Sequence, residues 1–306
     1  KCTALLGIAL LVLLVGRPSF GQPAHGPAAD PQPGIDILDY DFHLTLSDTT
    51  DRIEGAADVR LRVASDTLSA VRLDLIGPPD GPEETGMRVT SVTRDGAAVP
   101  FAQSQNILRI RGEGLAEGAT HTYQIQYAGV PADGLIIGTN RHGDRTFFGD
   151  NWPNRARHWL PVEDHLADKA TVEFRVTAPA QYRVVSNGAL VSDSTSGGMR
   201  YTHWRTDVPL PPKVMIIGVA DFAVDTVATV DGVPVQSWVY PEDQEAGFKD
   251  LGQAPPILRF FEENLGPYPY EKLANVQSTT RYGGMENAAA IFYSEEAVAD
   301  GEDSTP

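Results

Sequence analysis

From residue 35 onward, apolar and polar residues alternate along the chain, and this alternation constrains the fold more than any other feature. Phe42, Leu44 and Leu46 are separated by single polar residues, and residues 59–63 repeat the pattern after Gly55, which we interpret as a break. Successive side chains of a strand point to opposite faces, so alternation of this kind indicates strands with one buried face. The sequence therefore predicts a mainly β unit over residues 35–234.

Further strands and turns follow the same pattern. Candidate strands are residues 71–75, 107–111, 122–127, 172–176 and 182–185. Glycine-containing turns separate them, and Asn187-Gly188 suits a tight hairpin because both residues tolerate a positive φ. Many short strands with few helical segments predict a β-sandwich or a set of open, curved sheets.

The pattern changes after residue 234. Residues 236–240, 275–278 and 288–293 are predicted strands, and residues 242–251 can form a helix. A second helix is predicted to begin near Pro255 and to end at Gly266, with Ile257, Phe261 and Leu265 on one face. Residues 235–306 therefore predict the start of an α+β unit.

The first 21 residues are typical of a secretory signal peptide. Lys1 precedes an apolar run at residues 4–15, which is shorter than the roughly 20 residues that a membrane-spanning helix needs. Ser19 and Gly21 place small residues at positions −3 and −1 of a cut before residue 22. Residues 22–34 are rich in proline and predict an extended linker. We expect an exported protein, periplasmic or extracellular, without a stable membrane span after cleavage.

The charge of the chain excludes one class of partner. Asp and Glu number 41 against 24 Lys and Arg, a formal net charge of −17. Phosphate backbones attract Lys and Arg, so we expect no nucleic-acid binding. Cys2 is the single cysteine and lies in the signal peptide, so we expect no internal disulfide.

The segment 282–287, Tyr-Gly-Gly-Met-Glu-Asn, is a candidate ligand site. Its two glycines let a ligand approach the backbone, and an extended ligand can pair with a strand edge as an added strand. The carboxylate of Glu286 would suit a free α-amino group. On these residues alone, a bulge with a solvent-facing glutamate is the simpler interpretation.

No other segment shows a complete catalytic pattern. None of the seven histidines begins an H-E-x-x-H sequence, and we interpret His158 and His165 as surface or capping residues. The segment 150–158 holds several charges. We expect a packed loop there, held by pairing of Arg residues with Asp150 and Asp164.

Residues 283–287 resemble the G-x-M-E-N exopeptidase motif of the M1 family of zinc aminopeptidases, which includes aminopeptidase N and leukotriene A4 hydrolase. Three other segments resemble the same family in the same order: residues 159–171, the Ser-Asn-Gly at 186–188, and residues 260–273. Four ordered segments are more specific than one motif, and they favour a functional Glu286 over the bulge.

The resemblance implies a fold and a set of roles. The fold is a saddle-like N-terminal β domain over residues 35–234, followed by the start of a thermolysin-like catalytic domain over residues 235–306. Glu286 would hold the α-amino group of a peptide with a free N-terminus. The other residues of the implied substrate-binding segment are Tyr282, Gly283, Gly284, Met285 and Asn287. The implied cofactor is Zn²⁺, which an H-E-x-x-H and a later glutamate bind in this family.

The sequence departs from the family pattern in three ways, of which the third, Leu166 in place of a proline after Asp164-His165, is a local structural change. It ends at Pro306 without an H-E-x-x-H, so we expect the N-terminal part of a longer enzyme, with no metal ligand, no complete catalytic set and no activity alone. The alternative is a binding or scaffolding relative that lacks the zinc site. The family often has a second residue, Gln or Glu, that helps to hold the substrate amine. The corresponding position here is Trp152, and Asp150 or Asn151 could take over that role.

We also expect unpartnered apolar side chains in the part of the chain beyond residue 234. Ile257, Phe261 and Ile291 would lack the rest of a catalytic domain to pack against, which would make this part prone to aggregation.

Overall fold

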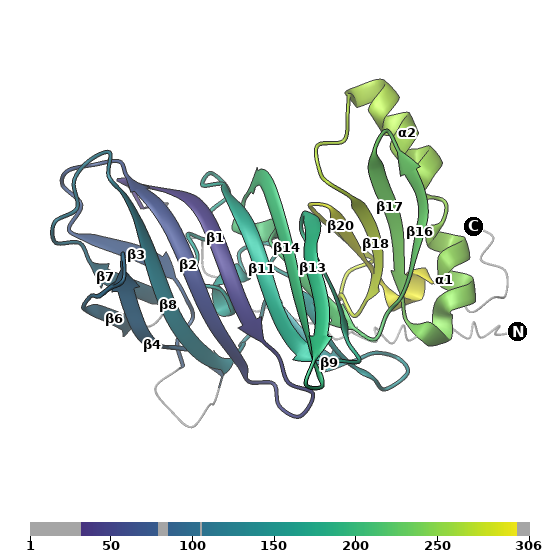
Figure 1. Cartoon of the computed structure of the whole chain (residues 1–306), viewed down its shortest axis with the longest axis horizontal. Helices are drawn as coiled ribbons and strands as arrows, with labels where there is room; N and C mark the ends of the chain where they lie inside the picture. The colour runs from purple at the N-terminus through teal and green to yellow at the C-terminus, as the bar shows by residue number, and fades with distance from the viewer. Residues whose placement is uncertain (1–31, 79–84, 105, 299–306) are drawn as a thin grey trace, which may run out of the picture.

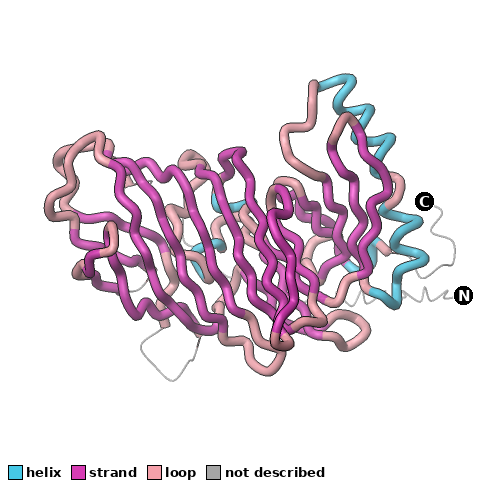
Figure 2. Tube along the Cα trace, viewed as in Figure 1, coloured by secondary structure: helices cyan, strands magenta, loops and turns pink. Residues whose placement is uncertain are grey.

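The computed structural model describes residues 32–78, 85–104 and 106–298, and over these the chain is mostly β-strand (Figure 2). The predicted signal peptide lies outside the described residues, as do most of the linker and the last eight residues. Gln32, at the end of the predicted linker, is docked on the β unit, because its backbone N–H donates to Glu163 Oε1 at 2.7 Å and its side chain to Ala70 O at 2.6 Å. No helix in the described part is long and apolar enough to cross a membrane.

The largest element is a curved sheet of eight strands (Figure 1). In spatial order its strands are β13 (Ala189–Ser196), β14 (Met199–Leu210), β11 (Ala170–Pro179), β1 (Ile35–Thr45), β2 (Ile53–Val63), β8 (Thr120–Val130), β4 (Gly86–Arg94) and β5 (Ala97–Ala98). Only β1 and β11 pair in parallel, and the other neighbours are antiparallel. The mainly β fold with curved sheets is confirmed.

Gly55 lies inside β2, so its interpretation as a break is wrong. A Cβ atom built on Gly55 would lie 2.3 Å from Cζ of Tyr127 on the neighbouring strand β8. The glycine therefore leaves room for a tyrosine ring that packs over the strand. Tyr127 is 2% exposed, and its ring has little space to move aside.

Two smaller sheets complete this unit. One contains β12 (Arg183–Ser186), β15 (Ile217–Ala220), β10 (Arg145–Gly149) and β9 (Leu135–Thr139); the other contains β3 (Ala70–Asp74), β7 (Ile107–Arg111) and β6 (Phe101–Ser104). The 3-10 helices η1 (Ala156–His158) and η2 (Pro212–Val214) lie in the connections.

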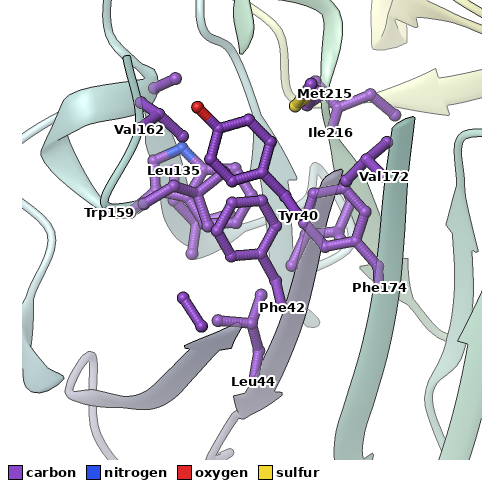
Figure 3. Packing of buried hydrophobic residues seen from close by; sticks show 14 of the residues in the cluster. Tyr40, Phe42, Leu44, Leu135, Trp159, Val162, Val172, Phe174, Met215 and Ile216 are labelled. Carbon is purple, nitrogen blue, oxygen red and sulfur yellow. The ribbon is translucent and has the colours of Figure 1, made fainter. Parts of the chain in front are cut away.

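Aromatic rings from the eight-stranded sheet pack against the loop after η1 (Figure 3). The ring centroids of Tyr40 and Phe42 are 5.3 Å apart, and Phe42 lies 5.3 Å from Phe174. Trp159 stacks on Phe174 at 6.2 Å. The apolar residues that alternate around Phe42 therefore form one buried face of β1, which packs against the loop containing Trp159.

Asn187-Gly188 does not form the expected hairpin turn. The strands before and after it, β12 and β13, belong to different sheets, so the pair is a corner between two sheets. Gly188 has a φ of +83°, and a Cβ there would lie 1.9 Å from Arg205 O. The positive φ of Gly188 was expected. The turn places the Asn187 side chain within hydrogen-bond distance of the backbone of Val214, Ile216 and Ala288.

The second unit is a five-stranded sheet with helices on one face (Figure 1). Its order is β16 (Ala223–Val230), β17 (Val233–Val239), β18 (Leu273–Ser278), β20 (Ala290–Ser294) and β19 (Gly284–Asn287), with α1 (Gln244–Leu251), α2 (Ala254–Leu265) and the 3-10 helices η3 (Pro241–Asp243) and η4 (Glu295–Ala297). The hairpin of β16 and β17 spans Pro234. We therefore propose that this unit begins near Ala223 and not at residue 235.

The two faces of the five-stranded sheet have different neighbours. Leu258 of α2 packs with Val235 and Leu273 in a small cluster on the helix side. Trp238 and Phe292 belong to the large apolar core that continues into the β unit. The sheet is therefore covered on one face by the β unit and, over β16 and β17, on the other face by the helices.

The predicted apolar face of α2 is exposed. Ile257 and Phe261 are 54% and 50% exposed, as expected for residues without partners, and Leu265 is 80% exposed. The buried residues of the helix are Pro255 and Leu258 instead. The expectation for Ile291 is wrong, because it packs against the Leu258 cluster.

A glycine pair tests the packing of β2 against β8. Gly55→Ala should lower the free energy of unfolding by about 1–3 kcal/mol, because the added methyl group would overlap the Tyr127 ring. Gly138→Ala in β9 is the matched control, since a Cβ there meets nothing within 4 Å. Urea unfolding followed by fluorescence measures both, and equal midpoints would contradict the proposed close approach.

Candidate active-site edge at strand β19

The candidate segment forms the last strand of the five-stranded sheet. Within the described residues β19 pairs only with β20, in an antiparallel register that sets Gly284 opposite Tyr293 and Glu286 opposite Ile291. Its other edge has no strand partner in this part of the chain. An edge with unpaired peptide groups can accept an extended peptide as an added strand.

The side chains of β19 alternate between solvent and core. Glu286 is exposed, whereas Met285 packs against the large core and Asn287 is 5% exposed. A Cβ built on Gly284 would lie 3.6 Å from Glu286 Oε1, and one built on Gly283 would meet nothing within 4 Å. The two glycines therefore leave the approach to the Glu286 carboxylate open.

An aromatic pair lies next to this strand. The rings of Trp152 and Tyr282 meet edge to face at a centroid distance of 5.9 Å, and the residues are 39% and 37% exposed. Tyr282 was expected at the site from the resemblance, but its contact with Trp152 was not. The only sequence signal was the unusual Trp-Pro among polar residues.

Asn151 is held by the fold. Its Nδ2 donates to Pro212 O at 3.1 Å and to Met215 O at 2.6 Å, and its Oδ1 accepts from Trp159 Nε1 at 2.8 Å. The side chain is fully buried. Both the Nδ2 and the Oδ1 of Asn151 are therefore already hydrogen-bonded within the protein.

Asp150 is buried beside the same loop. Its Oδ1 accepts from Arg155 Nη2, and Arg155 Nε donates to Trp152 O at 2.7 Å. Asp150 Oδ2 has no hydrogen-bond partner within the described residues. Burial raises the pKa of Asp150, and the positive charges of Arg155 and Arg281 oppose that rise.

The expected Arg–Asp pairing of this loop is confirmed. Arg155 also contacts Asp133, at 3.2 Å, and Arg157 Nε lies 2.9 Å from Asp164 Oδ2. Arg157 also lies 3.4 Å from Asp74. The loop that carries Trp152 is therefore fixed by buried charges.

The Ser-Asn-Gly corner connects the β unit to the candidate strand. Asn187 Nδ2 donates to Ala288 O at 2.7 Å and to Val214 O at 2.8 Å, while its Oδ1 accepts from Ile216 N at 2.8 Å. Ala288 directly follows β19, and Ala289 has a φ of +66°. A hydrogen bond from Asn187 of the β unit therefore fixes the turn between β19 and β20.

Lys272 makes a second link at the same corner. Its Nζ donates to Ser186 O at 2.5 Å and to Gly188 O at 2.9 Å, and it lies 4.4 Å from the centroid of the Trp204 ring. The residue is 3% exposed. Burial lowers the pKa of Lys272 to about 7.

The described residues offer no metal centre. They contain no group of three His, Cys, Asp or Glu side chains placed to hold a metal ion. His165 Nδ1 accepts from Ala167 N at 3.1 Å, which agrees with a local capping role. We therefore assign no zinc ligand within this part of the chain.

A β unit with a curved eight-stranded sheet, joined to a sheet whose open edge carries Gly-Gly-Met-Glu-Asn, defines the N-terminal portion of an M1-type peptidase. Comparison with known families agrees: residues 37–212 match the peptidase M1 N-terminal domain. The chain therefore belongs to the peptidase M1 family, as the sequence resemblance predicted.

Individual relatives are consistent with this membership. The chain is 22% identical over 231 residues to "Probable aminopeptidase 2" of Sulfurisphaera tokodaii, a match that covers 73% of this chain and 29% of that protein. The M1 zinc metallopeptidase of Deinococcus radiodurans superposes with a TM-score of 0.72 at 23% identity, covering 88% of this chain and 62% of that chain.

A mutant of the same Deinococcus enzyme, bound to a Tyr-Ser-Ala substrate, matches with a TM-score of 0.72 at 24% identity, over 88% of this chain and 62% of that one. A two-domain M1 zinc metallopeptidase mutant bound to L-tryptophan gives a TM-score of 0.74 at 24% identity, over 89% and 63% of the two chains. These likenesses show the fold. The chain spans less than a third of the curated relative and about three fifths of the solved structures.

The buried Lys272 predicts a pH dependence of stability. Its pKa is lower in the folded chain than the ordinary 10.5, so the unfolded chain binds more protons between pH 7 and 10.5. Stability contributed by this residue should therefore rise with pH in that window, by up to about 1.4 kcal/mol per pH unit, and be lost as the pH falls toward 7.

Lys272→Met should remove this dependence because the side chain no longer titrates. Urea unfolding of both chains at pH 7.5 and 9.5 measures it, and only the difference in slope matters, since the substitution also removes two hydrogen bonds. Parallel pH profiles for the two proteins would contradict the expected shift.

Proposed function

We propose that this chain is the N-terminal part of an exported zinc-dependent aminopeptidase that removes N-terminal residues from peptides. The observation that carries the proposal is the exposed Glu286 on the open edge of β19, beside two glycines that leave space for a peptide backbone. Membership of the M1 family supports it.

In this proposal the substrate lies along β19 as an added strand. Its backbone pairs with the free edge, and its α-ammonium group donates to the Glu286 carboxylate in a charge-assisted hydrogen bond. A fixed partner for the free amine places the first peptide bond at a constant distance from this carboxylate. The enzyme would consequently cut from the N-terminus.

The neighbouring residues complete the binding edge. Tyr282 and Trp152 form an aromatic wall beside the strand, and Gly283, Gly284 and Met285 line the substrate backbone. Asn287 is buried at the end of the strand, and its Nδ2 donates to Met285 O at 3.4 Å, which supports the edge from within.

Of the two candidates for a second contact with the amine, Asn151 has both ends of its amide engaged. Asp150 Oδ2 has no hydrogen-bond partner in the described part, but it is buried, so a direct contact with the amine would need the loop to open around it. The role that the contacts support for Asp150 is indirect, because it holds Arg155 and Arg155 holds the backbone of Trp152.

The metal belongs to the whole enzyme in this proposal. The solved relatives are zinc metallopeptidases, and Zn²⁺ would supply the activated water for hydrolysis. The residues of this chain that we describe do not form a site for it. Their part is to bind and orient the peptide.

Glu286→Gln tests the proposed contact with the amine. Calorimetric titration with Tyr-Ser-Ala should show that the wild-type chain binds the free peptide at least tenfold more tightly than its N-acetylated form. The substitution should weaken binding of the free peptide by about 10- to 100-fold, as expected for a hydrogen bond between charged groups worth about 1.5–3 kcal/mol. Binding of the acetylated peptide should be unaffected.

Glu296→Gln is the matched control, an exposed glutamate in η4. It should bind both peptides as the wild type does. If Glu286→Gln bound the free peptide with unchanged affinity, Glu286 would be a solvent-facing residue and the proposal would fail. Peptide binding combined with no cleavage of aminoacyl-anilides by the zinc-loaded complete gene product would support the binding or scaffolding alternative.

Export is a separate part of the proposal. Removing residues 1–21 should retain the protein inside the expressing bacterium, because the positive start, the apolar run and the small residues before the cut together direct secretion. Fractionation of a Gram-negative host, with the intact chain as control, measures this. Equal export of both forms would contradict a signal-peptide function.

A further inference from the structure

The aromatic pair Trp152 and Tyr282 is a contact between the two units beside the candidate binding strand. The two rings lie edge to face at a centroid distance of 5.9 Å, and the residues remain 39% and 37% exposed. Large aromatic rings are highly buried on average, so an exposed pair of them is informative. Beside a strand edge, this pair offers an apolar surface to a ligand.

The alternation of side chains places Tyr282 on the same side of the strand as Glu286. Pairing with β20 extends to Gly283, whose carbonyl oxygen accepts a hydrogen bond from the backbone of the last residue of β20 at 3.2 Å. Met285 packs against the large core, so the alternate positions Tyr282, Gly284 and Glu286 face the other side. The exposure of both Tyr282 and Glu286 agrees with this arrangement.

The Glu286 carboxylate leans back along the strand toward the aromatic pair. Its Oε1 lies 3.6 Å from the position that a Cβ atom on Gly284 would take. Two residues of a strand span about 7 Å, which is the distance along the strand from Gly284 to Tyr282. A residue whose ammonium group is bound at Glu286 therefore has the aromatic pair within reach of its side chain.

The contacts of its loop hold Trp152 in place. Asp150 binds Arg155, and Arg155 Nε donates to Trp152 O at 2.7 Å. Of residues 150–152, only Trp152 is exposed. A ring on a fixed backbone loses little conformational freedom when a ligand packs against it, which favours binding.

The charges near the pair favour an uncharged side chain in the ligand. Arg281 directly precedes Tyr282 and is exposed, and its positive charge opposes the rise in the pKa of Asp150, which places it near the Trp152 loop. A basic side chain would be repelled by Arg281, and an acidic one by the Glu286 carboxylate. An aromatic or large aliphatic side chain meets neither repulsion and gains from its removal from water.

We propose that Trp152 and Tyr282 form the subsite for the side chain of the first substrate residue, so that peptides beginning with an aromatic or large aliphatic residue bind most tightly. An aromatic side chain in this subsite can stack on one ring or meet it edge to face. The inference rests on the proposed function, because Glu286 must hold the ammonium group. It adds the class of substrate to that function.

Calorimetric titration of the full chain with four tripeptides tests the class of substrate. Phe-Ser-Ala should bind at least tenfold more tightly than Ala-Ser-Ala, Lys-Ser-Ala or Ser-Phe-Ala, because it alone brings an apolar ring at the first position. Trp152→Ala should reduce the ratio between Phe-Ser-Ala and Ala-Ser-Ala to below threefold. Trp152→Phe keeps a ring and should retain a ratio of at least fivefold. Phe260→Ala, which removes an exposed ring of α2, is the matched control and should leave the ratio unchanged.

Tryptophan fluorescence locates the bound side chain independently. Trp152 is 39% exposed, whereas the other three tryptophans are at most 7% exposed. Phe-Ser-Ala should shift the emission to shorter wavelength, because the indole of Trp152 loses water. Trp152→Phe should abolish this shift, and circular dichroism of each variant reports misfolding.

The outcomes separate this inference from the proposed function. Equal binding of Phe-Ser-Ala and Ala-Ser-Ala, a preference that Trp152→Ala leaves intact, or tighter binding of Ser-Phe-Ala or Lys-Ser-Ala would overturn the subsite. In each of these cases the contact of the amine with Glu286 would stand if N-acetylation still weakened binding. Loss of the acetylation effect, or of its dependence on Glu286, would remove the proposed function and the subsite with it.

Discussion

The hydrogen bonds of Asn187 are the contact on which the arrangement of the two units depends. One buried amide bonds to Val214 and Ile216 in the β unit and to Ala288 in the turn after β19. Lys272 adds bonds to the carbonyl groups on either side of Asn187. Because buried polar groups are expensive to leave unpaired, this corner fixes how the edge strand is presented.

The consequence for the site is a rigid strand with one accessible edge. The helices contact β16 and β17, and the β unit packs against the other face of the sheet, so β19 presents its unpaired edge and the exposed Glu286 side chain. The charged loop that carries Trp152 lies against Tyr282 and belongs to the β unit. A binding edge of this kind needs both units, although the motif itself lies in one.

Local patterns predicted the strands and the residues that carry the motif. Alternation located β1 and β7 closely, and the M1 resemblance selected Glu286 and Tyr282. The interpretations of Gly55 and Asn187-Gly188 were wrong because a glycine in a sequence does not indicate which group lies close to it in the fold. Beside Gly55 lies the ring of Tyr127 on the neighbouring strand, and beside Gly188 lies the carbonyl group of Arg205 in β14.

The sequence by itself determined the mainly β class, the family and the identity of the candidate substrate-binding residues, because periodicity and short motifs are local properties. Only the tertiary structure decided that β19 is an edge within the described residues, that Trp152 meets Tyr282, and that the Asn151 amide is bonded inside the core. These features depend on contacts between residues far apart in the chain. Burial and hydrogen-bond partners are set by those contacts, and no local pattern encodes them.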